Sequence, residues 1–464
     1  MNRMTLAATA LLALASIAAL AQPRTPHDQL AFDIYKELVE INTVTATGDT
    51  GQAADAMAER LRSAGFPAED VHVFKPAPRK GNLVARLRGS GAKRPMILMA
   101  HIDVVPARRE DWSTDPFKLV EQDGHYYGRG TGDDKFMAAA FVANLARYRK
   151  EGYRPDRDLI LVLETDEEIG DANGLGITWL IKNQRALIDA EFALNEGGGI
   201  GLDQGKPLRV GVQTSEKLYM DYNLVVRDVG GHSAQPRATN AIYKLAGALS
   251  RIGDFQFPLV MNDTTRAWFE RAAKFEEPAV AADMRAVAQP TPDSEAVRRL
   301  SAIPRFNSLL RTTCVATMLE GGHAPNALPQ LAKANVNCRI FPGHPVADVE
   351  ATLKRLGGEG VALERAYVPN ESPPSPLNPE IFGAIEKLAA ELWPGAPIIP
   401  SMSAGATDGA FLRNAGIATY GYSGLAGEAT ENRAHGRDER ILVKSFYEGV
   451  EHLYRLVKVL AGGR

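Results

Sequence analysis

Histidine and acidic residues follow three short apolar stretches of the sequence, and such side chains can bind metal ions and transfer protons. The apolar stretches span residues 96–100, 159–163 (followed by Glu164) and 192–194. The polar groups that come directly after them are His101-Ile102-Asp103, Thr165-Asp166-Glu167-Glu168 and Asn195-Glu196-Gly197. If the stretches are parallel strands, their carboxyl ends lie along one edge of a sheet, where these side chains should converge. The spacing therefore predicts a single polar crevice.

Two further groups could join this crevice. The segment Gly130-Thr131-Gly132-Asp133-Asp134-Lys135 precedes a helical stretch, residues 137–148, and His435 lies in the polar segment 432–436. The glycines of the first segment resemble a phosphate-binding loop. However, the dinucleotide pattern needs a glycine where Asp133 stands, and a carboxylate would repel phosphate. This argues against nucleotide binding.

Each group, taken alone, also has an ordinary structural explanation. His101 could simply be hydrogen bonded to Asp103, and Asp133-Asp134 could cap the following helix. The pair Glu167-Glu168 could lie in a solvated turn. In one crevice, however, these carboxylates would repel one another unless cations neutralised them. Imidazole and carboxylate suit zinc or a similar divalent ion, and one carboxylate can hold two ions about 3.5–4 Å apart for hydrolysis.

The elements that would position these residues alternate between helix and strand. Helical apolar spacing covers residues 28–38 and 52–64, and residues 82–87 form a further strand. Continuous apolar strands in such an alternation are typical of a parallel sheet that is buried on both faces. The alternation returns after about residue 371. We therefore predict an α/β fold, a mostly parallel sheet flanked by helices, built from residues 22–213 and 371–464.

A smaller domain, residues 214–370, is predicted to interrupt the larger one. Its elements follow the order strand–helix–strand–strand–helix–strand of a ferredoxin-like α+β sandwich, at residues 217–226, 240–251, 312–319, 332–340, 346–356 and 361–367. A charged, proline-containing insertion, residues 254–310, breaks this order, and its pattern does not place it in the fold.

The composition is that of a soluble globular protein. The chain has 464 residues, a formal net charge of −3, 45% hydrophobic residues and 23% charged residues. This length indicates two or three domains. A nearly balanced charge provides no overall basic field for nucleic acid or an anionic membrane, so we expect neither as a partner. The apolar content is too high for a disordered chain, and two cysteines cannot make a disulfide scaffold.

Residues 1–21 have the pattern of a secretory signal peptide. A cationic start at Arg3 precedes an apolar run, residues 6–20, and Ala19-Leu20-Ala21 provides the small residues of a cleavage site. The alternative is a membrane anchor, but the run falls short of the roughly 20 residues that span a bilayer. We therefore expect an exported protein, periplasmic or extracellular, that is not held in a membrane after cleavage.

Taken in order, the motifs resemble those of the co-catalytic zinc exopeptidases. This family includes glutamate carboxypeptidase, aminoacylase, acetylornithine deacetylase and succinyl-diaminopimelate desuccinylase. The matching segments extend over nearly all of the chain after the signal, at residues 99–106, 127–135, 165–168, 195–197, 231–233, 321–329, 407–408 and 434–436. The insertion and Leu310-Arg311-Thr312-Thr313 are most similar to the carboxypeptidase S and Gly-Xaa carboxypeptidase branch. The resemblance implies a zinc exopeptidase catalytic domain with an inserted lid or dimerisation domain.

The resemblance also implies a set of metal ligands. His101 and Glu196 would bind one zinc ion. Glu168 and His435 would bind the other, and Asp133 would bridge the two. The set implies two zinc ions per subunit, although cobalt or manganese could occupy the same sites. It further implies a cis peptide bond after Asp133.

Three catalytic roles follow from the same resemblance. Glu167 would act as general base and then as general acid, and Asp103 would orient His101. His232, on the smaller domain, would reach the active site of a partner subunit and stabilise the oxyanion. We therefore expect a homodimer formed through the smaller domain, unless the insertion covers that edge. The alternative for His232 is a turn residue without a catalytic role.

Substrate recognition is implied at three positions. Asn326 and Arg339 match family positions that grip a terminal carboxylate, and an arginine fork suits that anion. The alternative for Arg339 is a salt bridge at a strand end. Gly405 lies in a loop, residues 403–408, whose backbone groups would face substrate.

These residues together predict a secreted di-zinc metallo-exopeptidase of the carboxypeptidase or dipeptidase type, acting on small peptides with a free C-terminal carboxylate. One alternative is an amidohydrolase for N-acyl amino acids, with the same metals and a different acyl pocket. A second alternative is a non-catalytic binding protein, which the complete ligand set and Glu167 disfavour.

The two cysteines lie on the predicted hairpin of the smaller domain. Cys314 and Cys338 could form a disulfide in an exported protein, or remain two buried thiols if the cross-strand geometry does not suit the bond.

Overall fold

The computed structural model describes residues 24–368 and 370–464. The predicted signal peptide, residues 1–21, lies outside the described residues. None of the described helices is long and apolar enough to cross a membrane.

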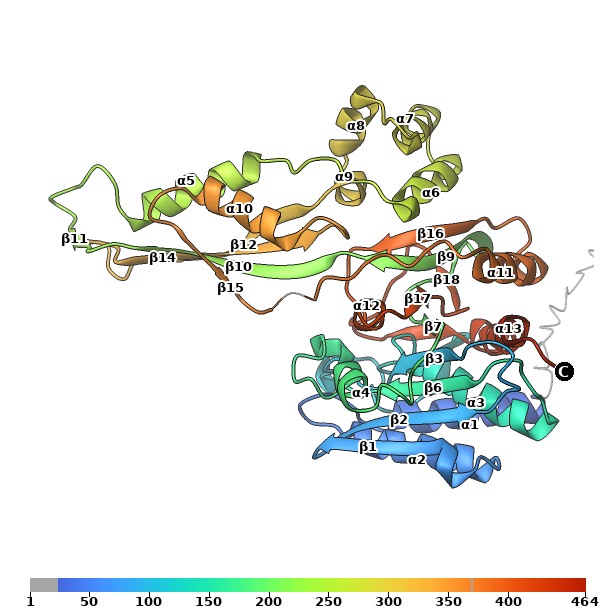
Figure 1. Ribbon diagram of the computed structural model, residues 1–464. Helices are drawn as coiled ribbons and strands as arrows, with labels where there is room; N and C mark the ends of the chain where they lie inside the picture. The colour runs from blue at the N-terminus through green and yellow to red at the C-terminus, as the bar shows by residue number, and fades with distance from the viewer. Residues whose placement is uncertain (1–23, 369) are drawn as a thin grey trace, which may run out of the picture.

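A ten-stranded mixed sheet forms the base of the molecule (Figure 1). Its strands run in the spatial order β1 (Val71–Ala77), β2 (Lys80–Leu87), β6 (Leu159–Glu164), β3 (Met96–His101), β7 (Phe192–Asn195), β17 (Ala418–Gly421), β9 (Lys206–Glu216), β8 (Ile200–Asp203) and β18 (Ala426–Glu428), with β16 (Ile398–Ser403) paired to β9. The central strands β6, β3, β7 and β17 pair in parallel. Every residue of β3 and β6 is buried, which is why both strands are continuously apolar up to their last residues, His101 and Glu164.

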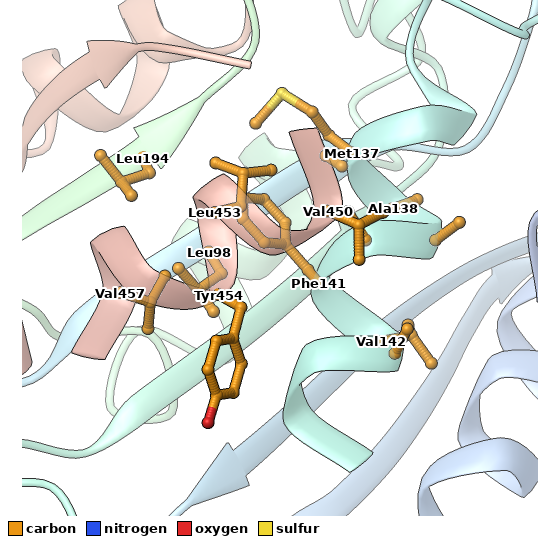
Figure 2. Packing of buried hydrophobic residues seen from close by; sticks show 14 of the residues in the cluster. Leu98, Met137, Ala138, Phe141, Val142, Leu194, Val450, Leu453, Tyr454 and Val457 are labelled. Atoms are coloured by element: carbon orange, nitrogen blue, oxygen red, sulfur yellow. The ribbon is translucent and has the colours of Figure 1, made fainter. Parts of the chain in front are cut away.

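Helices cover both faces of this sheet. One face packs against α1 (Pro26–Glu40), α2 (Thr50–Ser63), α3 (Lys135–Glu151), α11 (Pro379–Leu392) and α13 (Val443–Ala461). Figure 2 shows Phe141 of α3 beside Leu453 of α13, with Leu98 of β3 close by. The opposite face packs against the shorter α4 (Ile177–Asn183) and α12 (Gly409–Asn414). The predicted α/β architecture, with a parallel centre flanked by helices, is therefore confirmed.

A second, antiparallel sheet extends away from the first (Figure 1). Its order is β12 (Thr313–Gly321), β14 (Leu331–Ile340), β10 (Leu218–Arg227) and β15 (Ala362–Arg365). Two helices, α5 (Ala241–Asp254) and α10 (Val346–Gly357), pack against it around one apolar cluster. The order along the chain and across the sheet is that of a ferredoxin-like sandwich. A small ribbon of β11 (Gly231–His232) and β13 (Ala327–Leu328) lies at its far tip.

The insertion that the sequence could not place forms four helices: α6 (Asp263–Ala272), α7 (Pro278–Ala288), α8 (Ser294–Ser301) and α9 (Pro304–Leu310). They share an apolar cluster with Ile399 of β16, and Arg271 donates a hydrogen bond to the Ile398 carbonyl oxygen at 3.0 Å. The insertion is thus attached to the larger sheet although it interrupts the chain of the smaller one.

Short elements complete the described chain. A three-stranded sheet contains β4 (Val120–Gln122), β5 (His125–Tyr127) and β19 (Arg440–Leu442). The 3-10 turns span Ala68–Asp70, Arg109–Asp111, Glu167–Ile169 and Ala273–Phe275.

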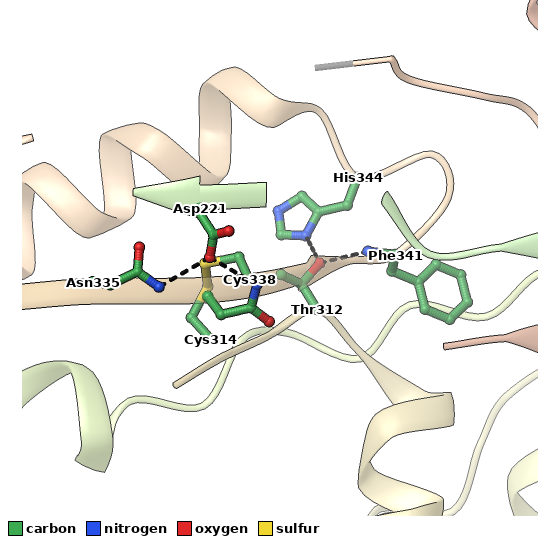
Figure 3. The surroundings of a disulfide bond; sticks show 8 residues. Asp221, Thr312, Cys314, Asn335, Cys338, Phe341 and His344 are labelled. Atoms are coloured by element: carbon green, nitrogen blue, oxygen red, sulfur yellow. Dashed lines mark hydrogen bonds between the residues drawn. A yellow bond between two sulfur atoms is a disulfide. The ribbon is translucent and has the colours of Figure 1, made fainter. Parts of the chain in front are cut away.

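A disulfide joins the two cysteines (Figure 3). Cys314 on β12 is the direct cross-strand partner of Cys338 on β14, with their Cα atoms 4.0 Å apart. Of the two arrangements left open by the sequence, the structure therefore has the bonded one.

Candidate active site

The three polar groups that follow apolar strands meet at one edge of the large sheet. His101 is the last residue of β3, and Glu196 comes directly after β7. Glu167 and Glu168 lie in the 3-10 turn that follows β6. The parallel pairing of β3 with both β6 and β7 places these strand ends side by side. The convergence expected from the sequence therefore occurs.

Asp133 lies between the two histidines. Its Oδ1 is 3.0 Å from Nε2 of His101, and its Oδ2 is 3.2 Å from Nε2 of His435. His435 Nε2 is also 3.0 Å from Oε2 of Glu168. On the other side, His101 Nε2 lies 4.0 Å from Oε1 of Glu196. One carboxylate thus faces two imidazoles, each of which has a second carboxylate nearby.

The electrostatics of this crowded site favour bound cations. Burial raises the pKa of Glu168 to about 7 and that of Glu196 to about 8, and neighbouring carboxylates add to both shifts. Burial opposes ionisation of Asp133 too, but hydrogen bonds with the two histidines hold its pKa below the usual range. Oε1 of Glu168 is buried and has no hydrogen-bond partner among the described residues. Divalent cations would neutralise these carboxylates and give that oxygen a partner.

Two overlapping groups of side chains have ligand atoms close enough to hold an ion. In each group the ligand atoms lie within 4.8 Å of one another: His101, Glu167 and Glu196 in one, and His101, Asp133 and Glu168 in the other. The donor set of imidazole nitrogen and carboxylate oxygen fits zinc and similar ions. The first group contains Glu167, whose Oε2 is 4.0 Å from His101 Nε2, so the expected base lies next to the candidate metal site.

Asp103 acts on the glutamates more directly than the sequence suggested. Nδ1 of His101 is 3.0 Å from the backbone oxygen of Asp103 but 3.7 Å from its carboxylate. The carboxylate instead accepts hydrogen bonds from the backbone N–H groups of Glu167 and Glu168, both at 3.2 Å. The Asp103 main chain thus makes the shorter contact with the ring, while its side chain, 3.7 Å from Nδ1, also fixes the glutamate turn, and the role of Asp103 in orienting His101 stays a prediction.

The turn that carries the glutamates has further support. Asp166, at its start, has a left-handed backbone with φ +70. Its buried carboxylate accepts hydrogen bonds from Lys80 Nζ at 2.5 Å and from Asn173 Nδ2 at 3.2 Å. These contacts hold the turn, and hence both glutamates, against the sheet edge.

The peptide bond between Asp133 and Asp134 is cis, as expected. Asp134 precedes α3 but makes no side-chain cap hydrogen bond, so the alternative explanation of this pair as a helix cap is wrong for Asp134.

Glu439 is a site residue that the sequence analysis missed. Its Oε1 accepts hydrogen bonds from the backbone N–H groups of Gly132 and Asp133, at 2.8 and 3.2 Å. Its Oε2 accepts one from Gly130 N–H at 2.9 Å and pairs with buried Arg129 at 2.7 Å. The glycine-rich loop thus binds an internal carboxylate in place of a phosphate. Its one sequence signal is its position four residues after His435.

A cavity of about 1140 Å³ opens beside the glutamate turn and extends between the two sheets. Glu167, Glu168 and His435 line it, and Arg339 and Gly405 line it as well. Arg339 donates a hydrogen bond to the Ala404 carbonyl oxygen at 2.5 Å, and no carboxylate of residues 24–368 and 370–464 forms the strand-end salt bridge considered from the sequence. The backbone N–H of Gly405 donates to Ser403 Oγ at 3.0 Å.

The other two residues expected at the site are not in this cavity. His232 lies on β11, and Asn326 lies next to β13, at the tip of the antiparallel sheet (Figure 1). Both are exposed, and the Asn326 carbonyl oxygen accepts a hydrogen bond from Ser233 N–H at 3.1 Å. Within one chain, therefore, Asn326 does not line the cavity that Arg339 lines.

Comparisons with known sequences place the chain among peptidases and related hydrolases. The family model described as peptidase family M20/M25/M40 matches residues 97–459. N-fatty-acyl-amino acid synthase/hydrolase PM20D1 of Xenopus tropicalis is 30% identical over 401 residues, which cover 83% of this chain and 74% of that protein. Probable carboxypeptidase S-like 2 of Dictyostelium discoideum is 28% identical, over 79% of this chain and 71% of that protein.

Solved structures share the fold. The M20 family metallo-carboxypeptidase Sso-CP2 from Sulfolobus solfataricus superposes with a TM-score of 0.69 at 20% identity, over 93% of this chain and 99% of that one. The YXEP protein of Bacillus subtilis, a dinuclear metal-binding peptidase, superposes with a TM-score of 0.61 at 12% identity, over 94% of this chain and 98% of that one.

Proposed function

The chain belongs to peptidase family M20/M25/M40, and on that premise we propose that it hydrolyses amide bonds in small substrates that carry a free carboxylate. The observation that carries the proposal is the position of Asp133 between two histidines, with Glu167 beside them in the wall of a cavity that Arg339 also lines. The arrangement brings together a group of metal ligands, a proton acceptor and an arginine that can bind the carboxylate of the substrate.

We propose two zinc ions per subunit as the cofactor, with cobalt or manganese as possible replacements. His101 and Glu196 would hold one ion. Glu168 and His435 would hold the other, and Asp133 would be shared, which its two histidine contacts support. Ions held there supply Lewis acidity to the substrate carbonyl and to water.

The protein's own contribution to the reaction is proton transfer and orientation. The Glu167 carboxylate takes a proton from the attacking water as the new carbon–oxygen bond forms, and returns it to the leaving nitrogen as the carbon–nitrogen bond breaks. Asp103 holds the backbone of Glu167, which limits the positions that the carboxylate can take. Burial raises the pKa of Glu167, which makes it a stronger base than an exposed glutamate.

Small peptides with a free C-terminal carboxylate are the first candidate substrates, and N-acyl amino acids are the second. The second is favoured by four large apolar side chains that are exposed and line the cavity: Ile169, Tyr219, Tyr367 and Val368. The rings of Tyr219 and Tyr367 stack at 6.2 Å. Such a wall suits an apolar acyl group or side chain next to the bond that is cleaved.

We further propose a homodimer through the antiparallel sheet. The edge strand β12 exposes Val315, Met318 and Leu319, and an exposed apolar edge is usually covered by another chain. His232 and Asn326 are remote from the cavity of their own chain, so they would act in the site of a partner subunit.

Export is proposed from the predicted signal peptide, residues 1–21. The disulfide between Cys314 and Cys338 supports it, because such bonds persist in oxidising compartments. The first residue of the mature protein, determined by N-terminal sequencing after expression with the full chain, tests this: Gln22 is expected, and an uncleaved Met1 would contradict it.

The central experiment combines metal analysis of the purified protein with a substrate screen. Dipeptides, N-acyl amino acids and the carboxamides of both are offered to the metal-loaded wild type and to Glu167→Gln. We expect the wild type to hydrolyse the carboxylate-bearing substrates faster than their carboxamides, and Glu167→Gln to hydrolyse neither. Hydrolysis confined to carboxamides, or near-normal turnover by a fully metal-loaded Glu167→Gln, would contradict the proposal.

A further inference from the structure

Lys217 is a buried lysine that has no acidic partner among the described residues. It stands between β9 and β10, at the junction of the two sheets, and only 1% of it is exposed. Its Nζ donates one hydrogen bond, to the Arg311 carbonyl oxygen at 2.7 Å. Across the described ranges, 24–368 and 370–464, no carboxylate forms an ion pair with it. Because lysine is rarely buried unless it is paired, this ammonium group lacks an anion.

A second cation lies close to Lys217. Arg339 on β14 is the cross-strand partner of Tyr219, two residues after Lys217, and its guanidinium lies over the Tyr219 ring at 4.4 Å. Burial, followed by the charge of Arg339, lowers the pKa of Lys217 to about 7. Lys217 and Arg339 both line the cavity. Two neighbouring cations in one cavity disfavour each other unless an anion binds there.

The nearby acidic side chains are already engaged. Glu216, adjacent in sequence, pairs with buried Arg413 at 2.5 Å. Asp221 accepts hydrogen bonds from Asn335 at 3.0 Å and Asn337 at 2.9 Å, and these bonds lower its pKa more than the charge of Arg339 does. Neither carboxylate is paired with the Lys217 ammonium group, so the anion that completes this pair of cations would come from outside the chain.

We propose that Lys217 binds the carboxylate of the substrate together with Arg339, and is therefore a second determinant of specificity for carboxylate-bearing substrates. The inference rests on the proposed amide hydrolysis for the identity of the anion. An ammonium group has three donors, and the bond to Arg311 uses one, so donors remain for a carboxylate.

The proposal also assigns a role to the insertion. The Arg311 guanidinium is nearly buried and donates to the Phe257 carbonyl oxygen and to Ser301 Oγ, both at 2.7 Å. The next residue, Thr312, contacts His344 Nδ1 at 2.7 Å and the Phe341 N–H at 3.0 Å (Figure 3). These bonds fix the carbonyl that holds Lys217, so the insertion positions the lysine from behind the cavity.

The test compares Lys217→Met with Lys206→Met, a change of an exposed lysine on β9. Each is measured on a hydrolysed substrate and on the carboxamide of that substrate. We expect Lys217→Met to raise KM for the carboxylate form by about 10-fold or more, with a smaller change in kcat. Turnover of the carboxamide and the metal content should stay as in the Lys206→Met control. Equal losses on both forms, or no loss on either, would overturn the proposal.

A binding measurement separates this inference from the proposed function. N-acetylphenylalanine and its carboxamide are titrated by calorimetry into metal-loaded Glu167→Gln protein, with and without Lys217→Met. If Lys217→Met weakens the binding of N-acetylphenylalanine but not that of its carboxamide, the proposal is supported even if neither probe is ever hydrolysed. If Lys217→Met does not fold, Lys217→Arg is used, which should keep the preference for the carboxylate. Equal weakening of both probes by Lys217→Arg would overturn it.

Discussion

The carboxylate of Asp103 accepts a hydrogen bond from the backbone N–H of Glu167 at 3.2 Å. Its other oxygen accepts the N–H of Glu168 at the same distance, so one buried side chain fixes both the expected base and an expected metal ligand. Bonds from N–H groups to a carboxylate are stronger than bonds between neutral groups, which makes Asp103 a rigid support for this turn.

Replacing Asp103 should therefore impair the site without removing a ligand. For Asp103→Ala we expect kcat or metal affinity to fall by about 10- to 100-fold, because residues that support metal ligands have effects of this size. Steady-state kinetics and metal analysis measure the effect, and Asp203→Asn, at an exposed position on β8, is the control. Unchanged activity and metal content in Asp103→Ala would show that the turn keeps its shape without this support.

Glu439 should be needed for stability as well as for metal binding. Glu439→Gln leaves the buried Arg129 without its charge partner and turns an amide NH₂ towards the N–H groups of the glycine-rich loop. Breaking a buried pair of this kind costs about 3–5 kcal/mol of unfolding free energy. Denaturant unfolding of the metal-free protein measures this cost.

Glu431→Gln provides the matched control for Glu439. Glu431 also pairs with arginines, Arg433 and Arg440, but it is partly exposed, so its loss should cost at most about 1 kcal/mol. Similar unfolding free energies for the two variants would contradict the role of Glu439 in holding the loop of Asp133.

The strand ends could be predicted from the sequence because their signal is local. Residues 96–100 and 159–163 are continuously apolar, and a parallel strand buried on both faces typically has that pattern. The edge strand β1 was missed, since its residues are half-buried and alternate irregularly. The β8 and β9 strands were missed as well, because β8 has only four residues and β9 has no continuous apolar run.

The roles of Glu439 and Lys217 could not be predicted because they depend on contacts between distant segments. Glu439 binds backbone groups more than 300 residues earlier in the chain, and Lys217 is held by a carbonyl 94 residues away. Neither residue belongs to a motif with a characteristic spacing. Only the folded arrangement shows that Glu439 has several hydrogen-bond partners and that Lys217 has no acidic partner in the part of the chain that the structure describes.

Buried His452 should make the protein less stable in mild acid. Its Nε2 is 2.7 Å from the Tyr422 hydroxyl, and burial lowers its pKa to about 4. The unfolded chain, with a histidine pKa of about 6.5, binds the proton more readily, so stability falls as pH drops from about 6.5 to about 4. The full loss is on the order of 3 kcal/mol.

Unfolding curves between pH 7 and pH 4, recorded with chelator so that metal release does not contribute, measure this loss. His452→Gln cannot take up the proton and should show a flatter pH dependence than the wild type, whereas His125→Gln on β5 should follow the wild type. A His452→Gln curve parallel to that of the wild type would assign the acid sensitivity to other groups.

The disulfide should resist alkylation and stabilise the antiparallel sheet. Alkylation without reduction should add no label to Cys314 or Cys338, and two labels would exclude the bond. Closing a loop of 24 residues in the unfolded chain contributes about 3 kcal/mol of stability. Denaturant unfolding of the double variant Cys314→Ala/Cys338→Ala, against the oxidised wild type, checks this value.

Two inactive variants should restore activity when they are mixed, if His232 serves the partner's site. One chain carries Glu167→Ala and lacks the base in its own site. The other chain carries His232→Ala and lacks the histidine that it would place in its partner's site. In a mixed dimer, one site has the intact Glu167 of its own chain and the intact His232 of its partner. Random exchange of subunits gives half mixed dimers with one complete site each, so activity should rise to about a quarter of the wild-type value. A mixture that stays as inactive as its components, while mass measurement shows mixed dimers, would exclude His232 from the partner's site.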